Sequence, residues 1–195
     1  MIGAVPVLLP ACLALVGIGT GLLWLQSSVG NLDELVMHRV NGAELPRSVD
    51  QLLAGLRIGG TTLVFVAALV LVGIARPPWA LGLALAAVTA EAAAKVLKIA
   101  VHRQRPFAAD SGVVVRLPRL PIDSSFPSAD AMRAAFLAGL TLAGGATPSW
   151  AVVPAILLAI VVGVGRVRSG AHYPLDVWTG LTIGFGAVLT WAGTL

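Results

Sequence analysis

The sequence predicts an all-α, polytopic membrane protein: a single membrane domain over residues 1–195, folded as a six-transmembrane-helix bundle. Hydrophobic residues make up 57 % of the chain and charged residues only 11 %, whereas charged side chains are about a quarter of an ordinary soluble domain. The charges are also clustered, which leaves uncharged runs at residues 1–32, 58–75, 77–90, 134–165 and 177–195. Because a bilayer-spanning helix needs roughly 20 apolar residues, these runs can supply the helices.

The same composition excludes several classes of protein. A net charge of +4 on so apolar a chain does not indicate a nucleic-acid-binding surface, and we expect no nucleic-acid partner. Cys12 is the only cysteine and lies in an apolar run, which excludes a disulfide scaffold.

In chain order, we expect helices at about 4–25, 58–75, 79–101, 128–146, 149–165 and 173–194. The segment 26–57 carries seven charges, and it spaces its apolar residues for one helical face (Leu32, Leu35, Val36, Val40). Such a pattern favours an amphipathic segment at the membrane interface. Arg76-Pro77-Pro78 predicts the next turn, with Trp79 as an interfacial anchor.

The 32-residue uncharged run 134–165 could hold one long helix or two. Gly144, Gly145 and Pro148 place strong helix breakers near its middle, so we expect a helical hairpin. Six crossings then put the segments 26–57, 102–127 and 166–172 on one side of the membrane, which we call face A. Because little of the chain lies outside the membrane, we expect the function at face A.

Three cations converge on face A from the ends of the predicted helices: Lys98, Arg105 and Arg166. Cationic side chains at membrane depth are costly and are usually retained for a ligand. With only one carboxylate expected beside them, they suggest an anion site, and guanidinium groups match phosphate oxygens bidentately. The start of the fourth helix adds the Ser128 hydroxyl and the backbone N–H of Ala129. We therefore predict a phosphate site.

His172 and Asp176 lie four residues apart, which is one helical turn. The carboxylate could accept the N–H of one ring nitrogen and leave the other nitrogen free to attack. Applied to a bound phosphate ester, this predicts in-line displacement through a phosphohistidine, with the cations stabilising the transition state. No metal or cofactor is expected, because the histidine spacing fits no metal or haem site.

These residues resemble the signature of the type 2 phosphatidic acid phosphatase superfamily, which includes lipid phosphatases and polyprenyl diphosphate phosphatases. Its pattern is Lys, six residues, Arg-Pro; then Pro-Ser-Gly-His; then Ser-Arg, five residues, His, three residues, Asp. The matching positions are Lys98, Arg105, Pro106, Pro127, Ser128, Arg166, His172 and Asp176. The resemblance implies that His172 is the nucleophile, that Asp176 orients it, and that Lys98, Arg105, Ser128 and Arg166 bind phosphate.

Three positions depart from that signature. Ala129 replaces a glycine, Gly165 replaces a serine, and Asp130 stands where the family has the histidine that protonates the leaving group. A carboxyl group is mostly ionised at neutral pH and is then a poor proton donor. Asp130 is therefore either a substitute catalytic group or simply an acidic first-turn residue paired with Arg133.

We expect a membrane phosphatase that acts on a lipid phosphate or a polyprenyl (di)phosphate, with membrane lipids around it. A phosphate leaving from a diphosphate is a weak base and needs little acid help, so Asp130 favours a diphosphate substrate. The alternative is a catalytically impaired family member that acts as a lipid-phosphate binder, a transporter or an accessory subunit. A second anionic group of the substrate could lie against Arg116, Arg119 or Arg168, which could equally be solvated charges. The sequence identifies no protein partner.

Two signals disagree on orientation in the expected bacterial plasma membrane. The resemblance implies that the active face lies outside the cytoplasm. However, 12 of the 13 Lys and Arg residues belong to face A, and the positive-inside rule would place that face in the cytoplasm. The resemblance favours the extracytoplasmic face.

Overall fold

The computed structural model of the chain describes residues 5–143 and 149–192, and this part is built of helices joined by turns and loops. The helices that form the body of the bundle are α1 (Val5–Gly21), α4 (Thr62–Ala75), α5 (Ala80–Val101), α7 (Ala129–Ala143), α8 (Val152–Arg168) and α9 (Pro174–Ala192). The other α-helices are α2 (Ser27–Gly42), α3 (Arg47–Leu56) and α6 (Pro106–Ala109). Short 3-10 turns occupy Leu22–Leu25, Arg57–Gly60, Pro77–Trp79 and Ser149–Ala151.

Local chemistry accounts for several helix ends. The Thr61 hydroxyl accepts the backbone N–H of Val64 and caps the start of α4. His102 takes a left-handed conformation, with φ of 48°, which ends α5. The fifth helix was expected to end at residue 165. Instead, α8 continues to Arg168 and carries Arg166 in its last turn. The turn predicted at Gly144, Gly145 and Pro148 lies outside the described residues.

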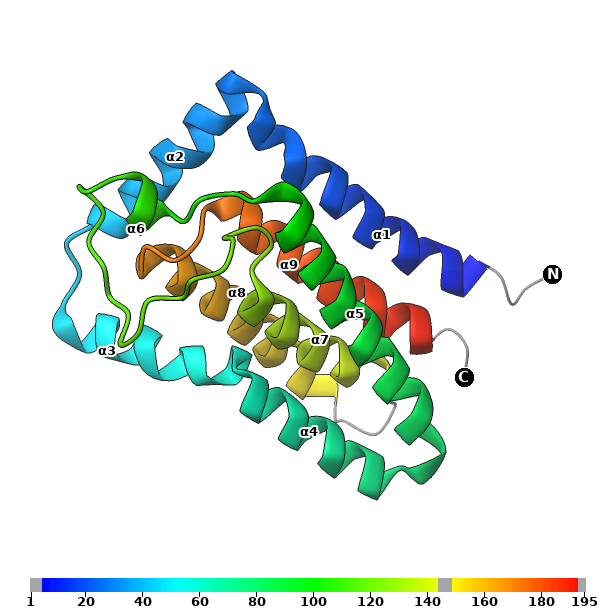
Figure 1. Cartoon of the computed structure of the whole chain (residues 1–195). Helices are drawn as coiled ribbons and strands as arrows, with labels where there is room; N and C mark the ends of the chain where they lie inside the picture. Colours follow the sequence, from blue (N-terminus) through cyan, green and yellow to red (C-terminus); the bar gives the residue numbers. More distant parts are fainter. Residues whose placement is uncertain (1–4, 144–148, 193–195) are drawn as a thin grey trace.

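The helix α9 lies at the centre of the bundle and packs against α7, α1, α5 and α8 (Figure 1). Two glycines permit its close approach to α7. A Cβ atom at Gly180 would collide with the carbonyl oxygen of Ser128, and one at Gly184 with that of Met132. Any larger residue there would push α9 away from the start of α7.

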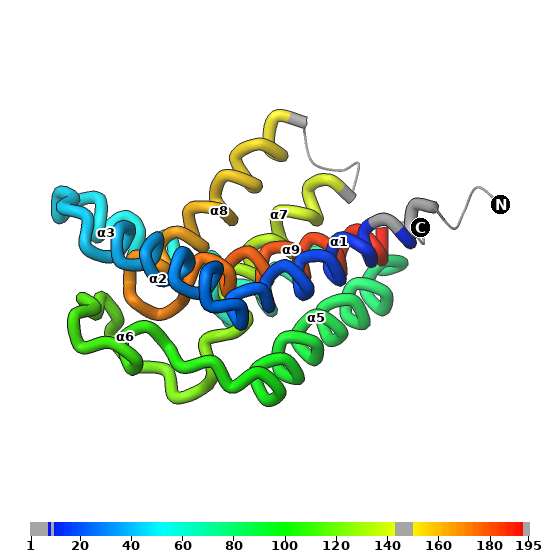
Figure 2. The backbone as a smooth tube through the Cα atoms, turned by 90° about the horizontal axis from the view of Figure 1, so that it is seen from above, coloured from blue at the N-terminus to red at the C-terminus, as the bar shows by residue number. Residues whose placement is uncertain are grey.

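Helices α2, α3 and α6 gather at one end of the bundle, opposite the start of α1 and the end of α9 (Figures 1 and 2). The chain bends by 95° before α2. The inner face of α2 is mostly polar, with Asp33, Met37 and Asn41 buried, while the apolar side chains of Leu32 and Leu35 are exposed. All three segments that define face A therefore meet at this end.

Two described helical stretches, Pro77–Ala109 and Pro174–Ala192, are long and apolar enough to cross a membrane. Two bent pairs could each form one more crossing: Pro10–Leu25 with Ser27–Gly42, and Arg47–Gly60 with Thr62–Ala75. The described parts of α7 and α8 have 15 and 17 residues, fewer than the roughly 20 of a full crossing. The described residues thus give two to four spans by length and composition.

Candidate active site

His172 lies in the short segment between α8 and α9 and is almost completely buried, with 2 % of its surface exposed. Its Nδ1 lies 2.7 Å from the carbonyl oxygen of Ser125. A carbonyl can only accept a hydrogen bond, so Nδ1 must carry the proton. The lone pair is therefore on Nε2, which accepts a hydrogen bond from Nη1 of Arg105 at 3.1 Å. The unprotonated nitrogen of His172 thus faces Arg105, one of the cations that the sequence predicts to bind phosphate.

The surroundings of His172 also keep the imidazole neutral. Burial, followed by the positive charges of Arg166 and Arg105, lowers the pKa of His172 well below its usual range. A neutral imidazole is the form that can attack phosphorus.

The carboxylate of Asp176 does not accept the imidazole N–H directly, in contrast to the expectation from the one-turn spacing. Its Oδ2 lies 3.6 Å from Nδ1 of His172, because the Ser125 carbonyl already takes that proton. The carboxylate is instead held by Nη1 of Arg103 at 2.8 Å and by the backbone N–H of Tyr173 at 2.9 Å. Asp176 therefore contributes a fixed negative charge near the ring and holds the start of α9.

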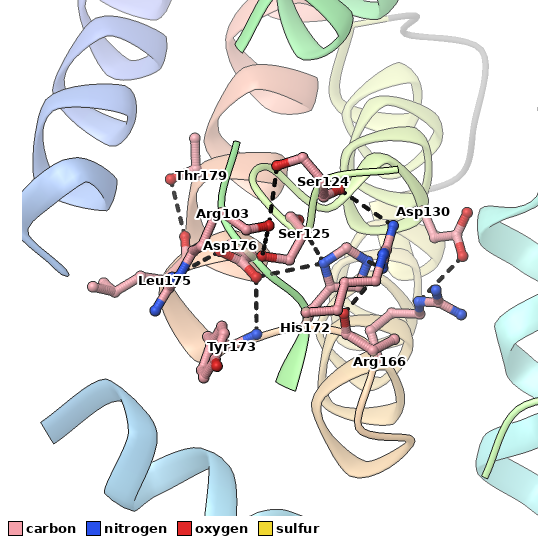
Figure 3. A network of polar contacts seen from close by, with 12 residues as sticks. Arg103, Ser124, Ser125, Asp130, Arg166, His172, Tyr173, Leu175, Asp176 and Thr179 are labelled. Carbon is pink, nitrogen blue, oxygen red and sulfur yellow. Dashed lines mark hydrogen bonds and ion pairs between the residues drawn. The ribbon is translucent and has the colours of Figure 1, made fainter. Parts of the chain in front are cut away.

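Arg103 is the centre of a buried ionic network that the sequence did not reveal. Its guanidinium lies between the rings of Trp24 and Tyr173, at 4.4 and 3.9 Å from their centroids. One end of the guanidinium binds Asp176, and Nη2 binds Asp33 of α2 at 2.7 Å. In Figure 3, Arg103 and Asp176 lie on one side of His172, and Arg166 and Asp130 on the other. This network fixes the side of the site that holds Asp176.

All three nitrogen atoms of the Arg105 guanidinium make hydrogen bonds around His172. Its Nη1 contacts the Ala171 carbonyl at 3.0 Å in addition to His172. Its Nε donates to the Asp123 carbonyl at 2.8 Å, and its Nη2 donates to the Asp123 carboxylate at 2.7 Å. Because these contacts occupy its donors, a phosphate can bind Arg105 only by displacing some of them.

Asp123 corrects the expectation that only one carboxylate would lie near the three cations. Its second oxygen lies 3.1 Å from Nζ of Lys98, which also donates to the Ser124 carbonyl at 2.5 Å. Burial opposes ionisation of this side chain, but Lys98 and Arg105 outweigh it and lower the pKa of Asp123 below its usual range. The Asp123 side chain is 54 % exposed. An anion from solution can therefore reach Lys98 and Arg105 and replace this carboxylate.

Arg166 and Asp130 form a second ion pair beside His172. Nε of Arg166 lies 3.2 Å from Oδ2 of Asp130, an ion pair that lacks hydrogen-bond geometry. The other oxygen of Asp130 lies 3.4 Å from Arg133, which also makes a bidentate ion pair with Glu91. Asp130 thus makes the first-turn pair with Arg133 that the sequence predicted. It also pairs with Arg166, which the sequence did not predict.

The start of α7 supplies an unused donor. The hydroxyl of Ser128 is buried and has no hydrogen-bond partner among the described residues, so it does not cap the helix. The backbone N–H of Ser128 donates to the carbonyl of Asp176 at 2.9 Å, and α7 begins at Ala129. An unsatisfied buried hydroxyl at a helix N-terminus suits a phosphate oxygen.

Two of the arginines considered for a second anion are already engaged. Arg168 binds the carboxylate of Asp50 and the carbonyls of Val40 and Asn41. Arg116 lies 3.4 Å from the same carboxylate. Both tie α2, α3 and α8 together at face A.

The chain was compared with known families, sequences and structures. Residues 79–194 match the profile of the PAP2 superfamily. No curated protein sequence matches the chain. The fold is similar to a transmembrane PAP2 type phosphatidylglycerolphosphate phosphatase from Bacillus subtilis, with a TM-score of 0.81 and 22 % identity over 95 % of this chain and 94 % of that one. It is also similar to LpxE from Aquifex aeolicus, with a TM-score of 0.70 and 26 % identity over 82 % and 94 % of the two chains.

Proposed function

The chain belongs to the PAP2 superfamily and has its transmembrane fold, and on that premise we propose that it is a membrane phosphatase that hydrolyses a lipid phosphate or diphosphate through a phosphohistidine. The observation that carries the proposal is the state of His172. Its proton is held on Nδ1 by Ser125, and its free Nε2 faces Arg105. A site that only bound phosphate would need the cations but not a neutral, oriented nucleophile.

The proposed reaction begins when the substrate phosphate displaces the Asp123 carboxylate from Lys98 and Arg105. Nε2 of His172 then attacks phosphorus, and the bond from phosphorus to the leaving oxygen breaks with its electron pair on that oxygen. Lys98, Arg105 and Arg166 stabilise the charge on the equatorial oxygens, together with the Ser128 hydroxyl and the backbone N–H of Ala129. Water hydrolyses the phosphohistidine, releasing inorganic phosphate and one proton.

The charge balance of the first step favours a diphosphate ester. From a monoester dianion, attack by neutral His172 expels an alkoxide, which must be protonated. From a diphosphate trianion, the same attack leaves a phosphohistidine of net charge −1 and a monophosphate ester dianion, and no proton is required. Asp130 is ion-paired with Arg166 and Arg133 and has no imidazole to donate a proton as the family's histidine does, so we propose that polyprenyl diphosphates are hydrolysed faster than phosphatidic acid.

We further propose that the whole chain is one domain that crosses the membrane six times, with face A outside the cytoplasm. Three of the arginines that argue for a cytoplasmic face A are held in ion pairs with carboxylates: Arg103, Arg116 and Arg168. Their positive charges thus have a structural role in ion pairs and need not be counted as signals of topology. A single cysteine at the exposed Ser111, in a Cys12→Ser background, tests the orientation by labelling of intact cells with a membrane-impermeant maleimide.

Phosphate release from purified protein in detergent micelles tests the function. The substrates are phosphatidic acid, phosphatidylglycerol phosphate and a polyprenyl diphosphate, each at the same mole fraction. We expect release by the wild type, its loss in His172→Ala, and unchanged release in His38→Ala, because His38 pairs with Asp110 outside the site. Binding without release from any of them would instead favour the impaired lipid-phosphate binder.

A further inference from the structure

A cavity of about 390 Å³ opens directly beside the catalytic cations. Two of its lining residues, Asp123 and Arg166, belong to the site described above. The others come from the turn after α3 and from the loop before α7: Arg57, Leu117, Arg119, Leu120, Pro121 and Ile122. The cavity is therefore an extension of the phosphate site toward α3.

Two arginines in this cavity have side chains without a partner in the described part of the chain. The side chains of Arg57 and Arg119 make no hydrogen bond or ion pair with any residue in the ranges 5–143 and 149–192, whereas the side chains of Arg103, Arg133 and Arg168 at the same end are all ion-paired. Arg57 is half-buried, and Arg119 is exposed. Arg57 is also close enough to Arg166 for their like charges to repel.

The acidic side chains of the described residues neutralise only some of the arginines that line the cavity. Arg166 is paired with Asp130, and Asp123 is paired with Lys98 and Arg105. The two charges that remain are those of Arg57 and Arg119, and they match the two negative charges of a monophosphate ester. Repulsion among neighbouring guanidiniums is relieved only when an anion enters between them.

We propose that Arg57 and Arg119 bind the second phosphate of a diphosphate ester, the one that departs when His172 attacks the terminal phosphorus. This inference rests on the proposed function and identifies the part of the site that selects its substrate. The bond between the terminal phosphorus and the bridging oxygen breaks, and the electron pair passes to that oxygen. The departing monophosphate dianion is stabilised by two fixed positive charges, which take over the task of the family's missing acid histidine.

The outer wall of the cavity suits the lipid attached to that phosphate. Leu120 is 51 % exposed and Ile122 is fully exposed, and both lie on the cavity side of the loop before α7. The first carbons of a polyprenyl chain can pass over these side chains into the bilayer. A phosphate monoester places its only phosphate against Lys98 and Arg105 and leaves the two arginines unused.

The test compares farnesyl diphosphate with farnesyl monophosphate, which share one chain, in the same micelles. The variants are Arg57→Gln, Arg119→Gln and the double variant, with Arg39→Gln as the matched control, since Arg39 lies exposed on α2 outside the cavity. We expect the double variant to lower kcat/KM for the diphosphate about 10- to 100-fold, as loss of charge-assisted contacts does. We expect a change of less than about threefold for the monophosphate and for the control.

An equal loss with both substrates would overturn the proposal, because the arginines would then attract anionic lipid in general. An unchanged diphosphate rate in the double variant would overturn it as well. Circular dichroism and the Tm of each variant in detergent check that its fold matches the wild type. Arg57→Lys keeps the positive charge and should therefore hydrolyse the diphosphate faster than Arg57→Gln does.

A binding measurement separates this inference from the proposed function. In the His172→Ala protein, calorimetry compares a farnesyl methylene-bisphosphonate with a farnesyl phosphonate, neither of which is hydrolysed. We expect the bisphosphonate to bind more tightly, and we expect Arg57→Gln with Arg119→Gln to abolish that difference. If the wild type releases no phosphate but this difference depends on the two arginines, the phosphatase function fails and the subsite stands. If release occurs and the difference is absent, the subsite fails.

Discussion

Replacement of Asp123 by asparagine should strengthen substrate binding. The Asp123 carboxylate lies 2.7 Å from Nη2 of Arg105 and 3.1 Å from Nζ of Lys98. Under the proposed function, these are the cations that contact the substrate phosphate. Binding therefore carries the cost of displacing this carboxylate, and Asp123→Asn removes most of that cost.

The size of the effect follows from the exposure of the side chain. A hydrogen bond to a charged group contributes about 1.5–3 kcal/mol when it is buried, but an exposed ion pair contributes about 0–1 kcal/mol. Because the Asp123 side chain is 54 % exposed, we take about 1–2 kcal/mol for the two contacts together. This corresponds to a KM about 5- to 30-fold lower. The cations contact the phosphoryl group in both the bound substrate and the transition state, so kcat should change less than about twofold.

The assay is the initial rate of phosphate release as a function of the mole fraction of substrate in micelles. Inhibition by inorganic phosphate should strengthen in parallel with the fall in KM. Asp110→Asn is the matched control, since Asp110 is another partly exposed acid of the same loop and pairs with His38. A KM that is unchanged or higher in Asp123→Asn, or that falls equally in Asp110→Asn, would refute competition between Asp123 and substrate.

Three further outcomes are expected. Asp130→His should raise kcat for phosphatidic acid about 10-fold or more, because general acid catalysis contributes about 10²- to 10⁴-fold; an unchanged rate would contradict the account of the leaving group. Arg103→Met should lower the free energy of unfolding by about 3–5 kcal/mol, because it leaves the buried carboxylates of Asp33 and Asp176 unpaired. Denaturant titration in detergent measures this loss. The control is His38→Ala, which breaks an exposed ion pair and should lower the free energy of unfolding by no more than about 1 kcal/mol. Burial and the nearby arginines lower the pKa of His172 below its usual 6.5, so the neutral, reactive form persists below that pH and kcat/KM should fall only in more acidic solution. Removing a positive charge raises this pKa, so the acidic limb of kcat/KM with one substrate should move to higher pH in Arg166→Gln than in the wild type, and the absence of this shift would contradict the electrostatic account.

Much of the site could be predicted from the sequence because its residues lie at helix ends. The order of the helices and the lengths of the apolar runs determine on which side of the membrane each helix end lies. Lys98 near the end of α5, Ser128 before α7 and Arg166 in the last turn of α8 reach the same end of the bundle for that reason. The spacing of His172 and Asp176 likewise brought both groups to this end of the bundle, although His172 lies just before α9 and only Asp176 lies in its first turn.

The residues that sequence reasoning missed act over long separations or through the main chain. Asp33 and Arg103 are 70 residues apart. Because α2 exposes Leu32, Leu35 and Val36 and buries Asp33, the burial pattern of soluble helices did not identify Asp33 as an inner residue. Asp123 lies in an irregular loop without periodicity, and the Ser125 carbonyl that orients His172 is a backbone group with no sequence signature. The amphipathic segment and its charges were the one signal that could have indicated a partner for Arg103.

Trapping of a phosphoenzyme during turnover tests the central claim most directly. The protein is mixed with a polyprenyl diphosphate, quenched in alkaline denaturant, in which phosphohistidine survives, and mapped by mass spectrometry. The account predicts phosphate on His172 in the wild type, with release of inorganic phosphate following its formation, and neither product in His172→Ala. Steady hydrolysis with no phosphate on His172, or hydrolysis retained by His172→Ala, would contradict it.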